Sequence, residues 1–253
     1  MTESSGQPEV AHVDNIPPAV NGETFPIAPT LLLLGASVLA NMIGAIIVVF
    51  AALGLKIVDL QAFFADPIPL AVTAQAIGYI PAVGVLVWWM RPATRVAWSE
   101  IGLRRPKVMD VVLGAGAGVV SVLIVSCIGL GIKTMTGMKV EDGSKLLGHH
   151  PGGPQFLMLA VLAVLGAPII EEMVFRGIIF NALRTRTGMI ASTIVSAGLF
   201  SAMHLSVVNF IPLMMVGAVF AIAYTRTKNL WTSMTAHAVF NGIGVAGVLL
   251  QHS

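Results

Sequence analysis

The sequence predicts an all-α fold, a polytopic membrane bundle of about seven transmembrane helices, from its composition and its apolar runs. Of 253 residues, 56% are hydrophobic and only 10% are charged, and the mean hydropathy is +0.88. Soluble globular domains carry about 25% charged residues. Several apolar runs reach the roughly 20 residues that a helix needs to cross the hydrocarbon core of a bilayer. The alternating pattern of a membrane barrel is absent, so helices are predicted throughout.

The chain is predicted to divide into an N-terminal tail and one membrane domain. Residues 1–29 contain no Lys or Arg and no sustained apolar period, which indicates a disordered tail and not a signal peptide. Residues 30–253 then form a single transmembrane domain. Its apolar segments are expected at about 31–55, 69–90, 108–131, 155–183, 188–206, 210–225 and 230–250.

Basic residues are unevenly distributed between the connecting loops, which predicts the orientation in the membrane. One side carries nine of them: Arg91, Arg95, Arg104, Arg105, Lys107, Arg184, Arg186, Arg226 and Lys228. The other side carries four: Lys56, Lys133, Lys139 and Lys145. Cytoplasmic loops are enriched in Lys and Arg. We therefore expect an integral membrane protein whose arginine-rich loops and N-terminus are cytoplasmic.

The third segment contains closely spaced glycines, in the run Gly114-Ala-Gly-Ala-Gly118. Small residues four apart let the backbones of two membrane helices approach closely. This run therefore predicts a helix–helix contact and has no chemical role. The single cysteine, Cys127, excludes an intramolecular disulfide.

The fourth segment carries charged side chains that a bilayer disfavours. Glu171, Glu172 and Arg176 lie in an apolar run, where each ionised group at mid-bilayer costs roughly 2.5–3.5 kcal/mol unless it is paired or hydrated. Glu172 and Arg176 are four residues apart on one helix face, which favours an ion pair. Glu171 points about 100° away from Glu172. It is therefore predicted to have no local partner.

Two later segments place polar side chains at the same four-residue spacing. Phe200 and His204 share one face of the fifth segment, and His237 and Asn241 share one face of the last. Taken singly, such a side chain is typical of an interhelical hydrogen bond. Taken jointly, the unpaired glutamate, the two histidines and the asparagine could provide a base, its partner and a set of hydrogen-bond donors.

These residue types match the needs of amide hydrolysis. Glu171 and His204 could take a proton from water, and His204 could later protonate the leaving amine. His237 and Asn241 would donate to the oxygen of the tetrahedral intermediate. A zinc site formed by Glu171, His204 and His237 is the alternative use of the same groups. The chain has no HExxH motif, so no cofactor is expected, and zinc stays the alternative.

The three polar groups resemble the motifs of the CPBP family, which includes the CAAX prenyl proteases and bacteriocin-processing membrane proteases. Glu171 to Arg176 is similar to its EExxxR motif, Phe200 to His204 to FxxxH, and His237 to Asn241 to HxxxN. The resemblance extends to residues 101–106 and 224–231. It therefore covers about residues 98–245, a protease-like core.

The resemblance implies an intramembrane endopeptidase of a bacterial cell membrane that acts on a membrane-associated peptide or protein, without a nucleic-acid partner. It implies that Glu171 and His204 activate water, that His237 and Asn241 bind the oxyanion, and that Glu172, Arg176 and Phe200 have a supporting role. A glutamate-dependent and a metal-dependent mechanism both stay open. A non-catalytic immunity or partner-binding protein and a proton-coupled transporter are the alternatives from other functional classes.

Straight, uniform helices would not place these groups at one depth. At 1.5 Å per residue, Glu171 would lie roughly 20 Å from the inner loop, His204 roughly 25 Å and His237 about 12 Å. A tilted or shifted fifth helix, or a helix broken near Pro168, would bring them level. We therefore expect an irregular helix at the site.

Overall fold

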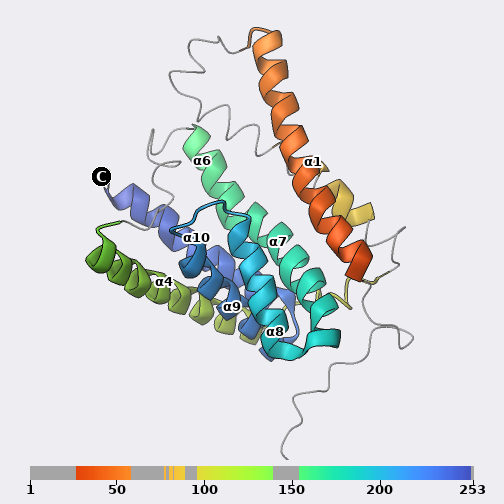
Figure 1. Ribbon diagram of the computed structural model, residues 1–253, viewed down its shortest axis with the longest axis vertical. Helices are drawn as coiled ribbons and strands as arrows, with labels where there is room; N and C mark the ends of the chain where they lie inside the picture. The colour runs from red at the N-terminus through yellow and green to blue at the C-terminus, as the bar shows by residue number, and fades with distance from the viewer. Residues whose placement is uncertain are drawn as a thin grey trace, which may run out of the picture.

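A computed structural model describes residues 27–57, 77, 80–81, 83–88, 96–138 and 154–251 (Figure 1). Every regular element in these ranges is a helix, which confirms the predicted all-α class. The elements are α1 (Ile27–Gly54), α4 (Val108–Thr136), α6 (Pro154–Val161), η3 (Leu162–Gly166), α7 (Ala167–Glu172), η4 (Met173–Phe180), α8 (Asn181–Ala202), α9 (Phe210–Thr227) and α10 (Leu230–Gln251). The predicted tail up to residue 26 and most of the segment predicted at 69–90 lie outside the described residues.

Four helical stretches in the described ranges are long and apolar enough to cross a membrane. They are Val108–Thr136, Phe156–Ala202, Phe210–Thr227 and Leu230–Gln251. The second combines the predicted fourth and fifth segments. A helical membrane bundle is thus confirmed, and the number of seven spans stays a prediction.

The long second stretch is divided by a sharp turn at Gly188. Its φ of 76° and ψ of 178° lie in a region that is essentially restricted to glycine. Figure 1 shows the chain reversing direction here, so that the later part of α8 returns beside α7. The predicted boundary between the fourth and fifth segments, 183–188, therefore lies at the correct place.

The stretch before this turn is wound irregularly. Two π-helical parts, η3 and η4, enclose the short α-helix α7, which carries both glutamates. Pro168 contributes to this winding because it has no backbone N–H to donate. The N–H of Ala167 bonds to the carbonyl of Leu162, five residues back, and leaves the Ala163 carbonyl without that donor. The irregular helix expected near Pro168 is present.

α4 packs closely on α10 through the predicted glycine run. A Cβ added at Gly114 would lie 2.4 Å from the Thr232 carbonyl oxygen, and one at Gly118 would lie 2.6 Å from the Ala236 carbonyl oxygen. Gly116 points away, and a Cβ there would meet nothing within 4 Å. Two of the three glycines therefore allow the backbones of α4 and α10 to touch, as predicted.

Replacing Gly114 with valine is expected to lower the free energy of unfolding by about 1–3 kcal/mol, because the new side chain forces the two backbones apart. Thermal unfolding of the purified protein in mild detergent measures the effect. Gly116→Val is the matched control on the same helix and should leave stability unchanged or slightly raised. Equal stability of the two variants would contradict a tight contact between α4 and α10.

The two further segments covered by the family resemblance lie against each other. Tyr224 donates its hydroxyl to the Ile101 carbonyl at 3.1 Å and accepts a hydrogen bond from the Asn181 side chain at 2.8 Å. The backbone N–H of Leu230 donates to the Gly102 carbonyl at 2.8 Å. The loop before α4 is thereby fixed to α8, α9 and the start of α10, at the end of the bundle predicted to be cytoplasmic.

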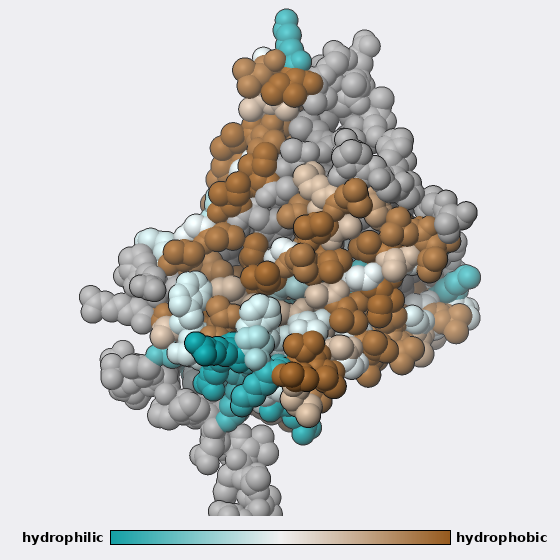
Figure 2. Space-filling view, turned by 180° about the vertical axis from the view of Figure 1, so that it is seen from behind, coloured by the Kyte–Doolittle hydropathy of each residue, from teal (hydrophilic) through white to brown (hydrophobic). Residues whose placement is uncertain are grey.

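The outer surface of the bundle suits a lipid environment. Large apolar side chains are exposed along α1, α4 and the outer faces of the other helices, among them Ile47, Phe50, Val112, Leu123 and Ile190. Figure 2 shows a broad hydrophobic face on one side, with hydrophilic side chains gathered mainly toward its lower end. This distribution is that of a protein surrounded by hydrocarbon over most of its height.

Candidate active site

The predicted pair Glu172–Arg176 forms and is wholly buried. Nη1 of Arg176 donates to Oε1 of Glu172 at 2.7 Å, and both side chains are 0% exposed. Nη2 of Arg176 also donates to the Gly217 carbonyl at 3.0 Å, which connects η4 to α9. Each charge therefore depends on the other for compensation, since neither reaches water.

Glu172 also forms a hydrogen bond with a second side chain, His237 on α10. Nδ1 of His237 lies 3.0 Å from Oε1 of Glu172, the same oxygen that binds Arg176. A carboxylate can only accept, so Nδ1 carries the proton. This bond orients the imidazole and leaves its Nε2 available for another group. Glu172 thus links two of the three motifs.

The Phe200 ring is the centre at which all three motifs meet. Its centroid lies 5.0 Å from that of the His204 ring and 5.6 Å from that of the His237 ring. The Arg176 guanidinium carbon lies 4.6 Å from the same centroid, a cation–π contact. Both histidine rings therefore lie beside the same phenyl ring, and their separation is smaller than the difference in depth expected for straight helices.

His204 lies just beyond the end of a helix and not within it. The predicted fifth segment extends to residue 206, but α8 ends at Ala202 and Leu205 has a φ of 51°. Nδ1 of His204 lies 2.9 Å from the Phe200 carbonyl oxygen. Because a carbonyl only accepts, Nδ1 carries the proton and Nε2 keeps a lone pair. His204 is exposed, and the hydrogen bond at Nδ1 leaves Nε2 as the atom that can accept a proton.

Glu171 is partly exposed on α7, next to the buried Glu172. Within the ranges that the structure describes, its carboxylate makes no hydrogen bond and no ion pair. The predicted contrast between a paired second glutamate and an unpaired first one is therefore present. The unpaired carboxylate keeps all its lone pairs for a ligand or for water.

Asn241 connects the last helix to the irregular one. Its Nδ2 donates to the Ala163 carbonyl at 2.7 Å, the acceptor released by the π-helical winding before Pro168. An amide nitrogen has two N–H groups, so one stays available. Asn241 lies one turn beyond His237 on α10, on the same face.

The alternative zinc site is not assembled. In the described part of the chain, no three side chains of His, Cys, Asp or Glu lie close enough together to hold one metal ion. Glu171, His204 and His237 belong to this part of the chain. The three ligands considered from the sequence are therefore not brought together there, and the choice between a metal-free and a zinc-dependent form stays a prediction.

Phe220 is a site residue that the sequence does not reveal. Its ring centroid lies 5.1 Å from that of His237, and 5.4 Å from the guanidinium carbon of Arg176. It is 0% exposed and forms one wall of the site from α9. Phe220 lies three residues after Gly217, whose carbonyl accepts a hydrogen bond from Arg176. The sequence around Phe220 contains no polar motif that would point to a site.

Comparison with known proteins agrees with these motifs. A family model described as type II CAAX prenyl endopeptidase Rce1-like matches residues 153–243, which include all three motifs. This segment is therefore similar to that family of membrane proteases. The chain is also 35% identical over 85 residues to a protein of Bacillus subtilis (strain 168) named "Putative membrane peptidase YdiL". The alignment covers 34% of this chain and 34% of that protein, so it spans about a third of the relative. No solved structure matches.

The segment matched by the family model extends from α6 to most of α10 and contains every site residue described above. α1 and α4 lie outside it. α4 nevertheless packs against α10 through Gly114 and Gly118, directly beside the helix that carries His237 and Asn241. The matched segment is therefore supported by a helix that the family match does not include.

Proposed function

We propose that this protein is an intramembrane endopeptidase that hydrolyses a peptide bond in a membrane-associated peptide or protein. The observation that carries the proposal is the meeting of three separate motifs at the Phe200 ring, which contacts both His204 and His237. Acid–base groups gathered within an apolar bundle are what peptide hydrolysis requires. The similarity of residues 153–243 to type II CAAX prenyl endopeptidases supports the same class of reaction.

The first step in this proposal is the removal of a proton from water. Within the described residues, the Glu171 carboxylate and Nε2 of His204 are acceptors to which no hydrogen bond is donated. Oε2 of Glu172 also has no partner, but it is buried. The resulting hydroxide adds to the substrate carbonyl carbon, and the C=O π electrons move to the oxygen. The C–N bond then breaks as its nitrogen takes the proton held by His204 or Glu171, which gives a carboxyl and an amine product.

The oxyanion of this intermediate is bound by His237 and Asn241 in the proposal. Asn241 donates its second N–H, since the first is bonded to the Ala163 carbonyl. His237 donates from Nε2, which requires the doubly protonated ring because Nδ1 already donates to Glu172. Glu172 already balances the charge of Arg176, so the negative charge of the oxyanion balances the added proton on His237. Each such donor typically contributes about 2.7–4 kcal/mol to lowering the barrier.

The test compares the membrane proteome of cells that make the wild-type protein with that of cells that make the His204→Gln variant. We expect new peptide termini, detected by mass spectrometry, only with the wild type, because glutamine cannot accept the proton of water. Equal amounts of both proteins in the membrane are the control for folding. An identical set of termini in the two samples would favour the non-catalytic or transporter alternatives over proteolysis.

A chelator distinguishes the two forms of the mechanism. We propose chemistry without a metal cofactor, so cleavage of a substrate found in this way should continue in proteoliposomes treated with a strong zinc chelator. Loss of cleavage that added zinc restores would overturn the metal-free form and leave the proteolytic function intact. Loss of cleavage in His204→Gln alone does not separate the two forms, since either uses this side chain.

A further inference from the structure

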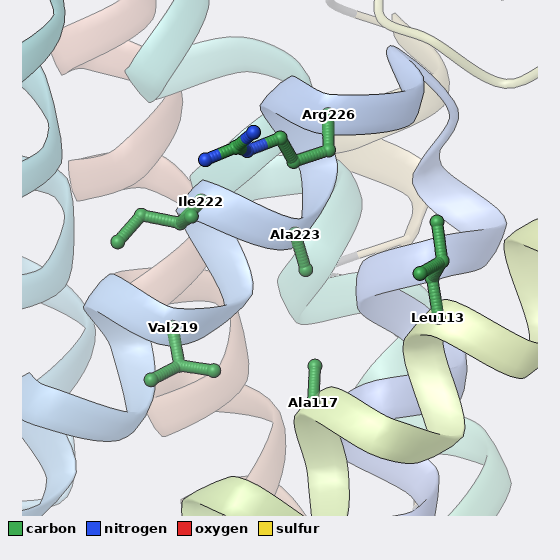
Figure 3. Close-up of a pocket in the computed structure, with 6 residues that line it drawn as sticks. All are labelled: Leu113, Ala117, Val219, Ile222, Ala223 and Arg226. Atoms are coloured by element: carbon green, nitrogen blue, oxygen red, sulfur yellow. The ribbon is translucent and has the colours of Figure 1, made fainter.

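An apolar groove lies on the outer surface between α4 and α9, and none of its lining residues belongs to the candidate active site. Its volume is about 220 Å³, and it is lined by Leu113, Ala117, Val219, Ile222, Ala223 and Arg226 (Figure 3). The lining residues on α9 extend over two turns, roughly 10 Å. Five of the six are aliphatic, and the sixth is an arginine at one end.

The groove arises from the way its two helices are packed elsewhere. Gly114 and Gly118 draw α4 against α10, and Gly217 draws α9 against α8, where a Cβ would lie 3.1 Å from Ala197. Between these contacts two of the lining residues are alanines. Figure 3 shows Ala117 and Ala223 pointing toward each other across the gap.

Arg226 gives the groove a positive end. Its side chain is exposed, extends beside Ile222 in Figure 3, and makes no hydrogen bond or ion pair within the described residues. Arg105 and Lys107 are also exposed at this end of the bundle, because the loop before α4 is fixed to the start of α10. The nearby acid Asp110 is buried and bonded to Asn229. The surface around the groove end is therefore basic.

We propose that this groove binds one membrane phospholipid with an anionic headgroup. An acyl chain lies along the alanine floor, and the lipid phosphate binds Arg226. The groove opens onto the apolar surface that lipid covers, and its volume is smaller than the 300–1,000 Å³ typical of pockets for compact small molecules, which suits a slender chain. Basic side chains at the cytoplasmic end of a membrane helix attract anionic headgroups. The inference holds whether or not the site cleaves peptides.

The test is native mass spectrometry of the full chain after extraction from liposomes of phosphatidylglycerol and phosphatidylcholine with identical acyl chains. We expect the wild type to retain one phosphatidylglycerol. Arg226→Gln should reduce its retention about fivefold relative to phosphatidylcholine, the effect expected for one basic residue near anionic lipid. Ala223→Leu fills the groove and should reduce retention of both lipids.

Two variants control for charge and bulk. Lys133→Gln removes an exposed lysine at the opposite end of α4, and Gly116→Leu adds a leucine on α4 where the surroundings are open. Both should retain lipid like the wild type, and thermal unfolding checks that all four variants are folded. Equal retention by wild type, Arg226→Gln and Ala223→Leu would overturn the proposal. So would efficient cross-linking of Ala223→Cys to a second copy or another protein, since the groove would then be a protein interface.

Discussion

Replacing Arg176 with methionine is expected to lower the free energy of unfolding by about 3–5 kcal/mol, the usual cost of removing one partner of a buried ion pair. The guanidinium is 0% exposed, bonds to Glu172 and the Gly217 carbonyl, and lies over the Phe200 ring. Its loss leaves the Glu172 charge buried with only His237 beside it. Unfolding in detergent, followed by circular dichroism, measures the change.

A double variant separates the charge from the packing. Glu172→Leu combined with Arg176→Met removes both buried charges, and replacing a buried pair by apolar side chains is often neutral or stabilising. We expect the double variant to be more stable than Arg176→Met alone, despite the lost bond to His237. If the two were equally unstable, the arginine would act through its contacts with Gly217 and Phe200 and not through its charge.

Replacing Glu171 with glutamine is expected to reduce cleavage by about 10²–10⁴-fold, the contribution typical of a general base. Glutamine keeps the shape of the side chain and cannot accept the proton of water. Stability should change by less than about 0.5 kcal/mol, because the Glu171 carboxylate has no hydrogen bond or ion pair within the described residues. Cleavage rates in proteoliposomes and thermal unfolding are measured on the same preparation.

The neighbouring glutamate is the matched control. Glu172→Gln makes the same chemical change one residue along the chain, at a carboxylate oxygen shared by Arg176 and His237. We expect this variant to have a clearly lower free energy of unfolding. Any decrease in its cleavage rate should follow from that destabilisation. Full cleavage by Glu171→Gln, or equal destabilisation by both variants, would contradict the division of roles between the two glutamates.

Local features of the site were predictable because they depend on spacing within one helix. The four-residue interval between Glu172 and Arg176 predicts the ion pair, and this pair forms even though Arg176 lies in a π-helical stretch. The interval from Phe200 to His204 likewise predicts the ring contact, although the helix ends between them. In both cases the two side chains are so close along the chain that they stay in contact when the backbone departs moderately from α-helical geometry.

Contacts between helices were not predictable in the same way. Glu172 and His237 are 65 residues apart, and nothing in either motif indicates that they share a hydrogen bond. Phe220 carries no polar signal at all. The early end of α8 was missed because the apolar run continues past Ala202. The Ser201 hydroxyl bonds to the Phe210 carbonyl at 2.6 Å and closes the turn, a tertiary contact that hydropathy does not record.

The two π-helical stretches make the site depend on the number of residues as well as on their identity. A hydrogen bond to the fifth preceding residue encloses one residue more than the usual bond to the fourth. Deleting one residue from η3 would turn the bond between Ala167 and Leu162 into an ordinary bond to the fourth preceding residue, so the helix could absorb the loss and keep its faces. α7 has no extra residue to give up, and a deletion there would rotate the helix on one side of it by about 100° relative to the other. Among related chains, single-residue deletions should therefore be tolerated in η3 and excluded from α7.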